Sequence, residues 1–158
     1  MTDASTIDAT DRRLLALLQA NGRLTNAELA EATGLSVSAC HRRVKQLEAR
    51  GVIAGYTAIV DRARAGLSVL AYVIVKLDSH TEERLEDFDR RIQLIDEVVA
   101  CYAISGSGDY ILKVVAPDMD SFAEVALKKL ARLPGVKDSA SNFVLSVMKL
   151  SPGWPLAV

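Results

Sequence analysis

Residues 25–53 read TNAELAEATGLSVSACHRRVKQLEARGVI, a pattern that predicts two helices joined by a tight turn. Thr25 and Glu28 have the spacing of a capping box, in which each side chain satisfies a free backbone donor at the start of a helix. Gly34 suits the left-handed conformation that ends a helix, because it has no Cβ. We therefore expect a short first helix that begins near Asn26.

The second helix of this pair has an apolar and a polar face. Ser36 and Ser38 are both suitable caps, and Gly51 is the expected stop. With about 100° per residue, one arc is apolar and should face the core. It consists of Val37, Cys40, Val44 and Leu47. The opposite arc is centred on Arg42, and residues 36–50 carry four cations against one anion.

The polar arc predicts a surface for double-stranded DNA. A charge run is usually only a solvated face, but this one lies on the second helix of a capped helix, turn, helix unit. In such units that helix meets base edges and phosphates. The residues predicted to contact DNA are Ser36, Ser38, His41, Arg42, Arg43, Lys45 and Gln46. His41 and Arg43 lie at the edges of the arc.

The composition indicates a soluble protein with a real core. The chain has 158 residues, of which 50% are hydrophobic, enough for one large or two small domains. We find no apolar run of the roughly 18 residues that a membrane span needs and no apolar signal segment, which predicts a cytoplasmic protein without membrane contact. Cys40 and Cys101 are too far apart in sequence for a CxxC metal site, so no metal is expected.

The positive charge is local. Residues 1–65 carry nine Lys or Arg against seven acids, whereas residues 66–158 carry ten against thirteen. A basic patch on an otherwise acidic molecule favours docking of one surface on DNA over indiscriminate coating.

The first third of the chain predicts a helix-turn-helix domain, winged-helix-like, over residues 1–52. A further amphipathic helix is expected over 8–20. Residues 53–61 are rich in β-branched and aromatic side chains and should be extended, and 62–66, RARAG, look like a hinge. We therefore assign 53–66 to a linking strand and hinge.

Residues 67–158 predict a ferredoxin-like βαββαβ sandwich, so the whole chain is expected to be an α+β protein. The expected order is strand 67–77, helix 82–95, a hairpin of strands 98–105 and 109–116, a helix capped by Asp118 that runs to Leu133, and a last strand over 141–150. Both helices of this arrangement cover one face of the sheet.

The predicted strands are apolar on both sides. In the first strand, Val73 and Val75 point one way while Tyr72 and Ile74 point the other. Because helices cover only one face, the second must be buried against something, and we infer a second copy of the chain. Isolated surface hydrophobes are normal, but not so many on adjacent strands. A two-fold dimer also matches a pseudo-palindromic operator.

The chain resembles the Lrp/AsnC, or feast/famine, family of bacterial and archaeal transcriptional regulators. The resemblance rests on four motifs: DRRLLALLQANGRLTNAELA, LSVSACHRRVKQLEARGVIAGYTAIVD, the GSGDY turn, and LPGVKDSASNFVLSVMK. It implies a DNA-binding domain, a linking strand and a ligand-sensing domain. It also implies a homodimer that assembles into tetramers or octamers and responds to an amino acid, with no cofactor.

The turn at 106–109 matches the family's GxxD loop, which helps to form the effector pocket. Glycines let backbone N–H groups approach a ligand carboxylate, and Asp109 is suited to receive an ammonium. An ordinary hairpin turn would need the same glycines. The expected effector residues are Gly106, Ser107, Gly108, Asp109, Tyr110, Ser139 and Ser141.

Two other classes of function remain open to the sequence. One is a small enzyme in which Asp109 acts with Tyr110 or His80, but no nucleophile, base and orienting group cluster in sequence. The other is a ligand-sensing or assembly module without DNA binding, which would lack the cations around Arg42. His80 is expected in a loop before a helix, and Trp154 as a tail anchor on the sheet or on another subunit.

Overall fold

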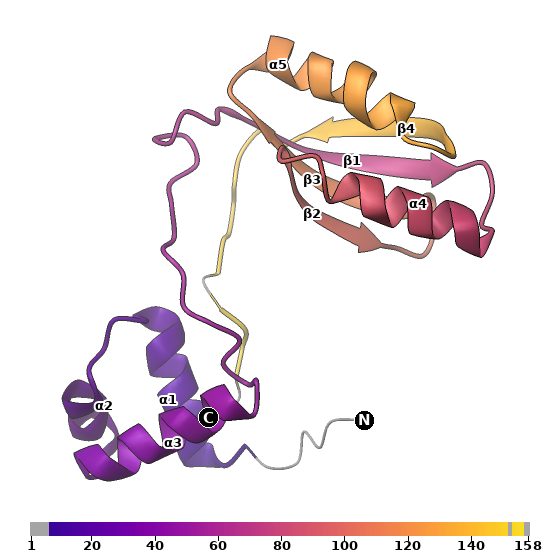
Figure 1. Ribbon diagram of the computed structural model, residues 1–158. Helices are drawn as coiled ribbons and strands as arrows, with labels where there is room; N and C mark the ends of the chain where they lie inside the picture. Colours follow the sequence, from indigo (N-terminus) through magenta and orange to yellow (C-terminus); the bar gives the residue numbers. More distant parts are fainter. Residues whose placement is uncertain (1–6, 152, 157–158) are drawn as a thin grey trace. The chain divides into compact units, whose positions relative to one another are not determined.

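The computed structural model describes residues 7–151 and 153–156 and divides the chain into two compact units (Figure 1). The helical unit contains residues 7–59 together with the described part of the tail that begins at Met148. The sheet unit is Val60–Val147. The tail thus groups with the helices, whereas the sequence-based division had placed it in the second domain.

The helical unit consists of α1 (Ala9–Ala20), α2 (Asn26–Thr33) and α3 (Val37–Ala49). The capping box before α2 is confirmed: the Thr25 hydroxyl accepts the Glu28 N–H, and the Glu28 carboxylate accepts the Thr25 N–H at 2.7 Å. Gly34 ends α2 with a φ of 72°. Local side-chain chemistry therefore fixes where the two helices meet.

Side chains from all three helices form the core of this unit. Leu14, Leu29 and Cys40 are almost fully buried, and Leu47 on α3 is 1% exposed. The apolar arc predicted for α3 is wrong in one member, since Val37 is 51% exposed. Val37 is the first residue of α3, ahead of the turns that pack against α1 and α2.

The segment after α3 forms no strand ladder with any described part of the chain, although its sequence favours an extended conformation. The tail is fastened to α1 instead of the sheet. The Trp154 N–H donates to Gln19 Oε1 at 2.6 Å, and Gln19 Nε2 donates to the Trp154 carbonyl at 3.1 Å. The indole itself is 83% exposed, so the backbone makes this anchor.

The sheet unit has the predicted βαββαβ order, with a four-stranded antiparallel sheet in the order β2-β3-β1-β4. The strands and helices are β1 (Val69–Leu77), α4 (Glu82–Ile92), β2 (Val98–Ala103), β3 (Tyr110–Ala116), α5 (Met119–Glu124) and β4 (Val136–Phe143). Beyond Glu124, α5 continues as a π turn and a 3₁₀ turn to Arg132. Asp118 caps α5 as predicted, accepting the Ser121 N–H.

Both helices lie over one face of the sheet (Figure 1). Val73 and Val75 of β1 are buried in one cluster with Phe88 of α4 and Phe122 of α5. Helix α4 ends at Ile92, earlier than the predicted 95. This cluster is the core that holds the hairpin between β2 and β3 in place.

The last strand had been predicted over 141–150, and these bounds are wrong beyond residue 143. β4 runs over Val136–Phe143 and pairs with β1, so that Ser139 lies opposite Val75 and Ser141 opposite Val73. A strand needs a partner edge, and the ladder with β1 ends where Phe143 lies opposite Ala71, with one further bond from the Val144 N–H to the Leu70 carbonyl. The more apolar residues that follow, such as Leu145 and Met148, are more than 90% exposed.

The second face of the sheet carries apolar side chains without a covering helix. Tyr72 and Tyr102 are 37% and 60% exposed, and Ile74 and Ile111 stand beside them. A register shift at Val99 breaks the predicted alternation in β2, so that Val98 packs on the helix-covered core with Cys101. In β1 the two faces are those that the sequence predicted, with Val73 and Val75 buried under the helices and Tyr72 and Ile74 on the other side.

Candidate nucleic-acid interface and ligand pocket

The polar face of α3 presents a row of exposed side chains. Ser38, Arg42 and Gln46 follow one another at four-residue spacing and are all exposed. Ser36 is the N-cap: its hydroxyl accepts the Ala39 N–H and lies 3.2 Å from the Ser38 hydroxyl. Within the described residues no side chain or carbonyl pairs with the Arg42 guanidinium, so this cation is available to a partner.

Arg43 points to a different part of the unit. Its guanidinium lies 2.7 Å from the Asp11 carboxylate and 2.8 Å from that of Asp8. These contacts, led by that with Asp11, raise the pKa of Arg43. Asp8 caps α1 and Asp11 stands in its first turn. Arg43 therefore binds α3 to the start of α1, and a DNA contact would have to displace both carboxylates.

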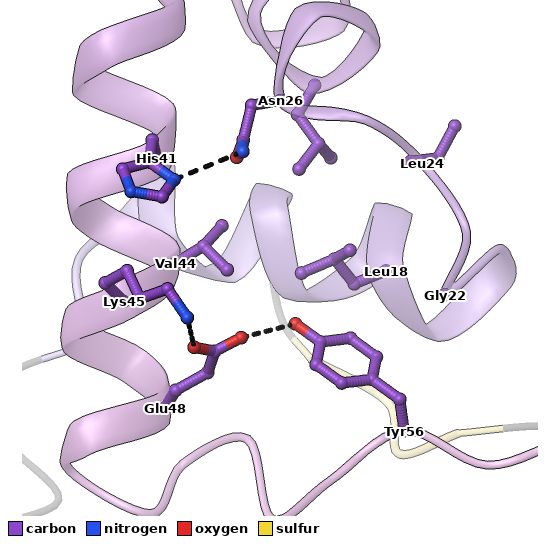
Figure 2. A pocket seen from close by; sticks show the side chains of 10 residues that line it. Leu18, Gly22, Leu24, Asn26, His41, Val44, Lys45, Glu48 and Tyr56 are labelled. Atoms are coloured by element: carbon purple, nitrogen blue, oxygen red, sulfur yellow. Dashed lines mark hydrogen bonds and ion pairs between the residues drawn. The ribbon is translucent and has the colours of Figure 1, made fainter.

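The remaining predicted contacts lie along a flank of α3, where a pocket of about 260 Å³ opens (Figure 2). His41 Nδ1 is 3.3 Å from the Asn26 amide of α2. Lys45 Nζ donates to Glu48 at 2.8 Å, and the Tyr56 hydroxyl donates to the other oxygen of Glu48 at 3.1 Å. His41 and Lys45 thus lie beside the exposed row of Ser38, Arg42 and Gln46. Each contacts a neighbouring side chain, His41 that of Asn26 and Lys45 that of Glu48.

The hairpin loop lines a second pocket, of about 440 Å³, within the sheet unit. Its lining residues are Lys76, Leu77, His80, Gly106, Ser107, Gly108, Asp109, Lys137 and Asp138. Four of the predicted effector residues, 106–109, are therefore together. Three others are not among them: Tyr110 stacks on Phe88 with ring centroids 4.5 Å apart, and Ser139 and Ser141 lie further along β4.

Asp109 supports the walls of this pocket. One carboxylate oxygen accepts the Leu77 N–H at 2.7 Å, and the other lies 2.8 Å from His80 Nε2. The bond from Leu77 and then that from His80 lower the pKa of Asp109. A ligand ammonium at Asp109 would share an oxygen with His80. The sequence placed His80 in a loop before a helix, and the structure confirms that position.

Gly108 lets the hairpin approach β1 closely. A Cβ at this position would lie 2.3 Å from Ile74 Cγ2 and 3.2 Å from the Val75 carbonyl oxygen. The Asp109 N–H donates to the same Val75 carbonyl at 2.9 Å. Gly108 is therefore needed for the close packing of the hairpin on β1. At this position the backbone of the loop lines the pocket.

Sequence reasoning missed the charged residues that face the loop. Lys76 ends the exposed side of β1, and Asp138 is its partner in β4. Lys76, Lys137 and Asp138 thus place positive and negative side chains around the 106–109 loop. Only the pairing of β1 with β4, which are about 60 residues apart in sequence, brings these groups together. The local sequence signal for these residues was the pair of opposite charges at Lys137 and Asp138.

Two family models match this chain and between them cover most of it. The model for the Lrp/AsnC ligand binding domain matches residues 70–154, and a winged helix-turn-helix DNA-binding model matches residues 7–54. The chain belongs to the Lrp/AsnC family. Both domains of this Lrp/AsnC regulator are thus regulatory, one for DNA and one for a ligand.

Relatives of known role support the same assignment. The leucine-responsive regulatory protein of Escherichia coli K12 is 37% identical over 145 residues, covering 92% of this chain and 88% of that protein. A Neisseria meningitidis transcriptional regulator, solved as a complex with L-methionine, is similar with a TM-score of 0.91 and 38% identity, covering 96% of this chain and 97% of its own. A feast or famine regulatory protein from M. tuberculosis, also complexed with L-methionine, has a TM-score of 0.82 and 32% identity, covering 91% and 95%.

In residues 7–151 and 153–156 no three His, Cys, Asp or Glu side chains gather as metal ligands would. The helices of the same residues include none long and apolar enough to cross a membrane.

Proposed function

We propose that this Lrp/AsnC regulator reads double-stranded DNA with the exposed face of α3 and senses an amino acid in the pocket beside the 106–109 loop. The observation that carries the first half is the row of Ser38, Arg42 and Gln46, with Arg42 exposed and unpaired by any described residue. Lys45 and His41 flank this row. Ser36 caps the start of α3, where the backbone N–H groups of the first helical turn lie beside the row. Arg43 is not part of the proposed DNA-reading face, because its guanidinium pairs with Asp8 and Asp11.

The second half is supported by the charges around the loop. A free amino acid carries a carboxylate and an ammonium a few ångströms apart. Lys76 and Lys137 are suited to the carboxylate, and Asp138 to the ammonium, while Asp109 holds the loop. Two similar regulators were crystallised with L-methionine, which makes a zwitterionic amino acid the class of ligand we propose.

The uncovered sheet face supports assembly. Tyr72 and Tyr102 with their apolar neighbours form a surface that we propose is buried against a second copy of the chain, as the basis of dimers and of larger, tetrameric or octameric, assemblies. A dimer presents two copies of α3 to a pseudo-palindromic site. Such a protein works where the DNA is, in the cytoplasm.

The test combines DNA selection with ligand screening. The full chain is used to enrich a duplex from a random-sequence pool, and each of the common amino acids is then tested for a shift in thermal unfolding and in affinity for that duplex. At least one amino acid should raise the unfolding temperature, because a ligand that binds only the folded state stabilises it. Asp138→Asn should abolish the shift, whereas Asp96→Asn, at an exposed acid outside the pocket, should keep it.

Enrichment of no sequence would contradict the DNA half of the proposal. An enriched duplex without any amino-acid effect, on either affinity or unfolding temperature, would contradict the sensing half alone.

A further inference from the structure

Tyr56 connects the segment that follows α3 with the flank of the proposed reading face (Figure 2). Its hydroxyl donates to Glu48 Oε1 at 3.1 Å. Its ring lies over the turn between α1 and α2, where a Cβ on Gly22 would be 3.6 Å from Tyr56 Cδ1. One side chain thus contacts both the base of α3 and the turn that supports it.

Glu48 is the one acid within α3, and it stands beside Lys45, one of the residues predicted to contact DNA. Its second oxygen accepts Lys45 Nζ at 2.8 Å. The bonds from Lys45 and then from Tyr56 lower the pKa of Glu48, so it is charged when DNA arrives. A carboxylate in this place competes with a DNA phosphate for Lys45 and repels that phosphate.

We propose that Tyr56 is a positioning residue for DNA binding, which holds the Glu48 carboxylate in place when Lys45 exchanges it for a DNA phosphate. The Lys45 side chain is 64% exposed, so its ion pair with Glu48 is weak and open to exchange. The Glu48 side chain is 28% exposed and keeps the Tyr56 hydroxyl as partner after Lys45 leaves. Without the Tyr56 hydroxyl, the Glu48 carboxylate moves with Lys45 towards the DNA phosphates. The negative charges of the carboxylate and the phosphates then repel each other.

The inference rests on the proposed DNA-reading face of α3 and adds a route by which the chain regulates it. Tyr56 lies in the segment that leads from α3 to the sheet unit. Any rearrangement that withdraws Tyr56 from Glu48 lowers affinity for DNA without a change in the reading residues themselves.

A double-mutant cycle tests the inference in the full chain, with the duplex enriched by the wild-type protein as probe. Tyr56→Phe should weaken binding by about three- to tenfold, the usual net worth of a typical intramolecular hydrogen bond. Glu48→Gln should bind at least as tightly as the wild type, since it removes the competing charge. In the Glu48→Gln background, Tyr56→Phe should cost less than about twofold, because the two residues act as one unit. Thermal unfolding of each variant checks that the helical unit is folded.

An equal loss from Tyr56→Phe in both backgrounds would overturn the inference, because additive effects mean that Tyr56 acts independently of Glu48. No loss in the wild-type background would overturn it as well. Both results leave DNA binding by α3 intact, whereas failure of the wild-type chain to enrich any duplex would remove the proposed function and this inference together.

Discussion

At the scale of single residues, the pocket depends on how Asp109 is held. Its carboxylate accepts the Leu77 N–H and contacts His80, and both lower its pKa below the ordinary value of 3.8. The folded state therefore binds the Asp109 proton more weakly than the unfolded state. The stability from these contacts is complete above the ordinary pKa and is lost as the pH falls towards the lowered pKa of the folded state.

We expect Asp109→Asn to be less stable than the wild type near neutral pH, with a difference that shrinks as the pH falls below about 4. Urea unfolding of both proteins across this range measures it. Asp96→Asn, at an exposed carboxylate with no bond to a described residue, should unfold with the wild type throughout. A loss of stability that is independent of pH would mean that Asp109 acts through its shape and not through its charge.

The residues that sequence reasoning found are those with local signals. The spacing of Thr25 and Glu28 predicts a helix start because both partners lie within one turn. Asp109 was predicted from its turn, which matches the family's GxxD loop. Lys76 and Asp138 were missed because only strand pairing places them together.

At the scale of elements, the orientation of α3 depends on an ion pair that the sequence had interpreted as a DNA contact. A wheel places Arg43 at the edge of the polar arc, but it cannot show that α1 brings Asp8 and Asp11 to it. Long-range pairing also placed β4 over Val136–Phe143 against the apolar pattern. Periodicity predicts the faces of an element, and the neighbouring elements decide which of its polar side chains remain available.

Arg42 and Arg43 offer a matched pair of substitutions for this point. Arg43→Met should lower the free energy of unfolding by about 1 to 3 kcal/mol, because the buried Asp11 carboxylate loses its cation. Arg42→Met, at an exposed site, should change it by less than about 0.5 kcal/mol. Chemical denaturation measures both. Equal stability of the two variants would show that the ion pairs of Arg43 with Asp8 and Asp11 contribute nothing.

At the scale of the whole molecule, the chain joins a DNA-binding unit to a ligand-binding unit of the Lrp/AsnC family. The order of strands and helices and the two apolar faces of β1 followed from hydrophobic periodicity together with capping and turn residues, because these signals lie within or beside each element. The grouping of the tail with the helical unit did not, since it rests on the backbone of Trp154 and the side chain of Gln19.

The salt dependence of binding tests most directly the proposal that the exposed face of α3 reads DNA. Affinity for the enriched duplex is measured against salt concentration for the wild type and for Arg42→Ala, with sedimentation as a check on assembly. We expect a steep fall with salt in the wild type, and in Arg42→Ala a loss of about 1 to 3 kcal/mol at unchanged oligomer size. Equal affinity of the two proteins would contradict this proposal. Wild-type affinity that depends neither on the DNA sequence nor on the salt concentration would contradict it as well.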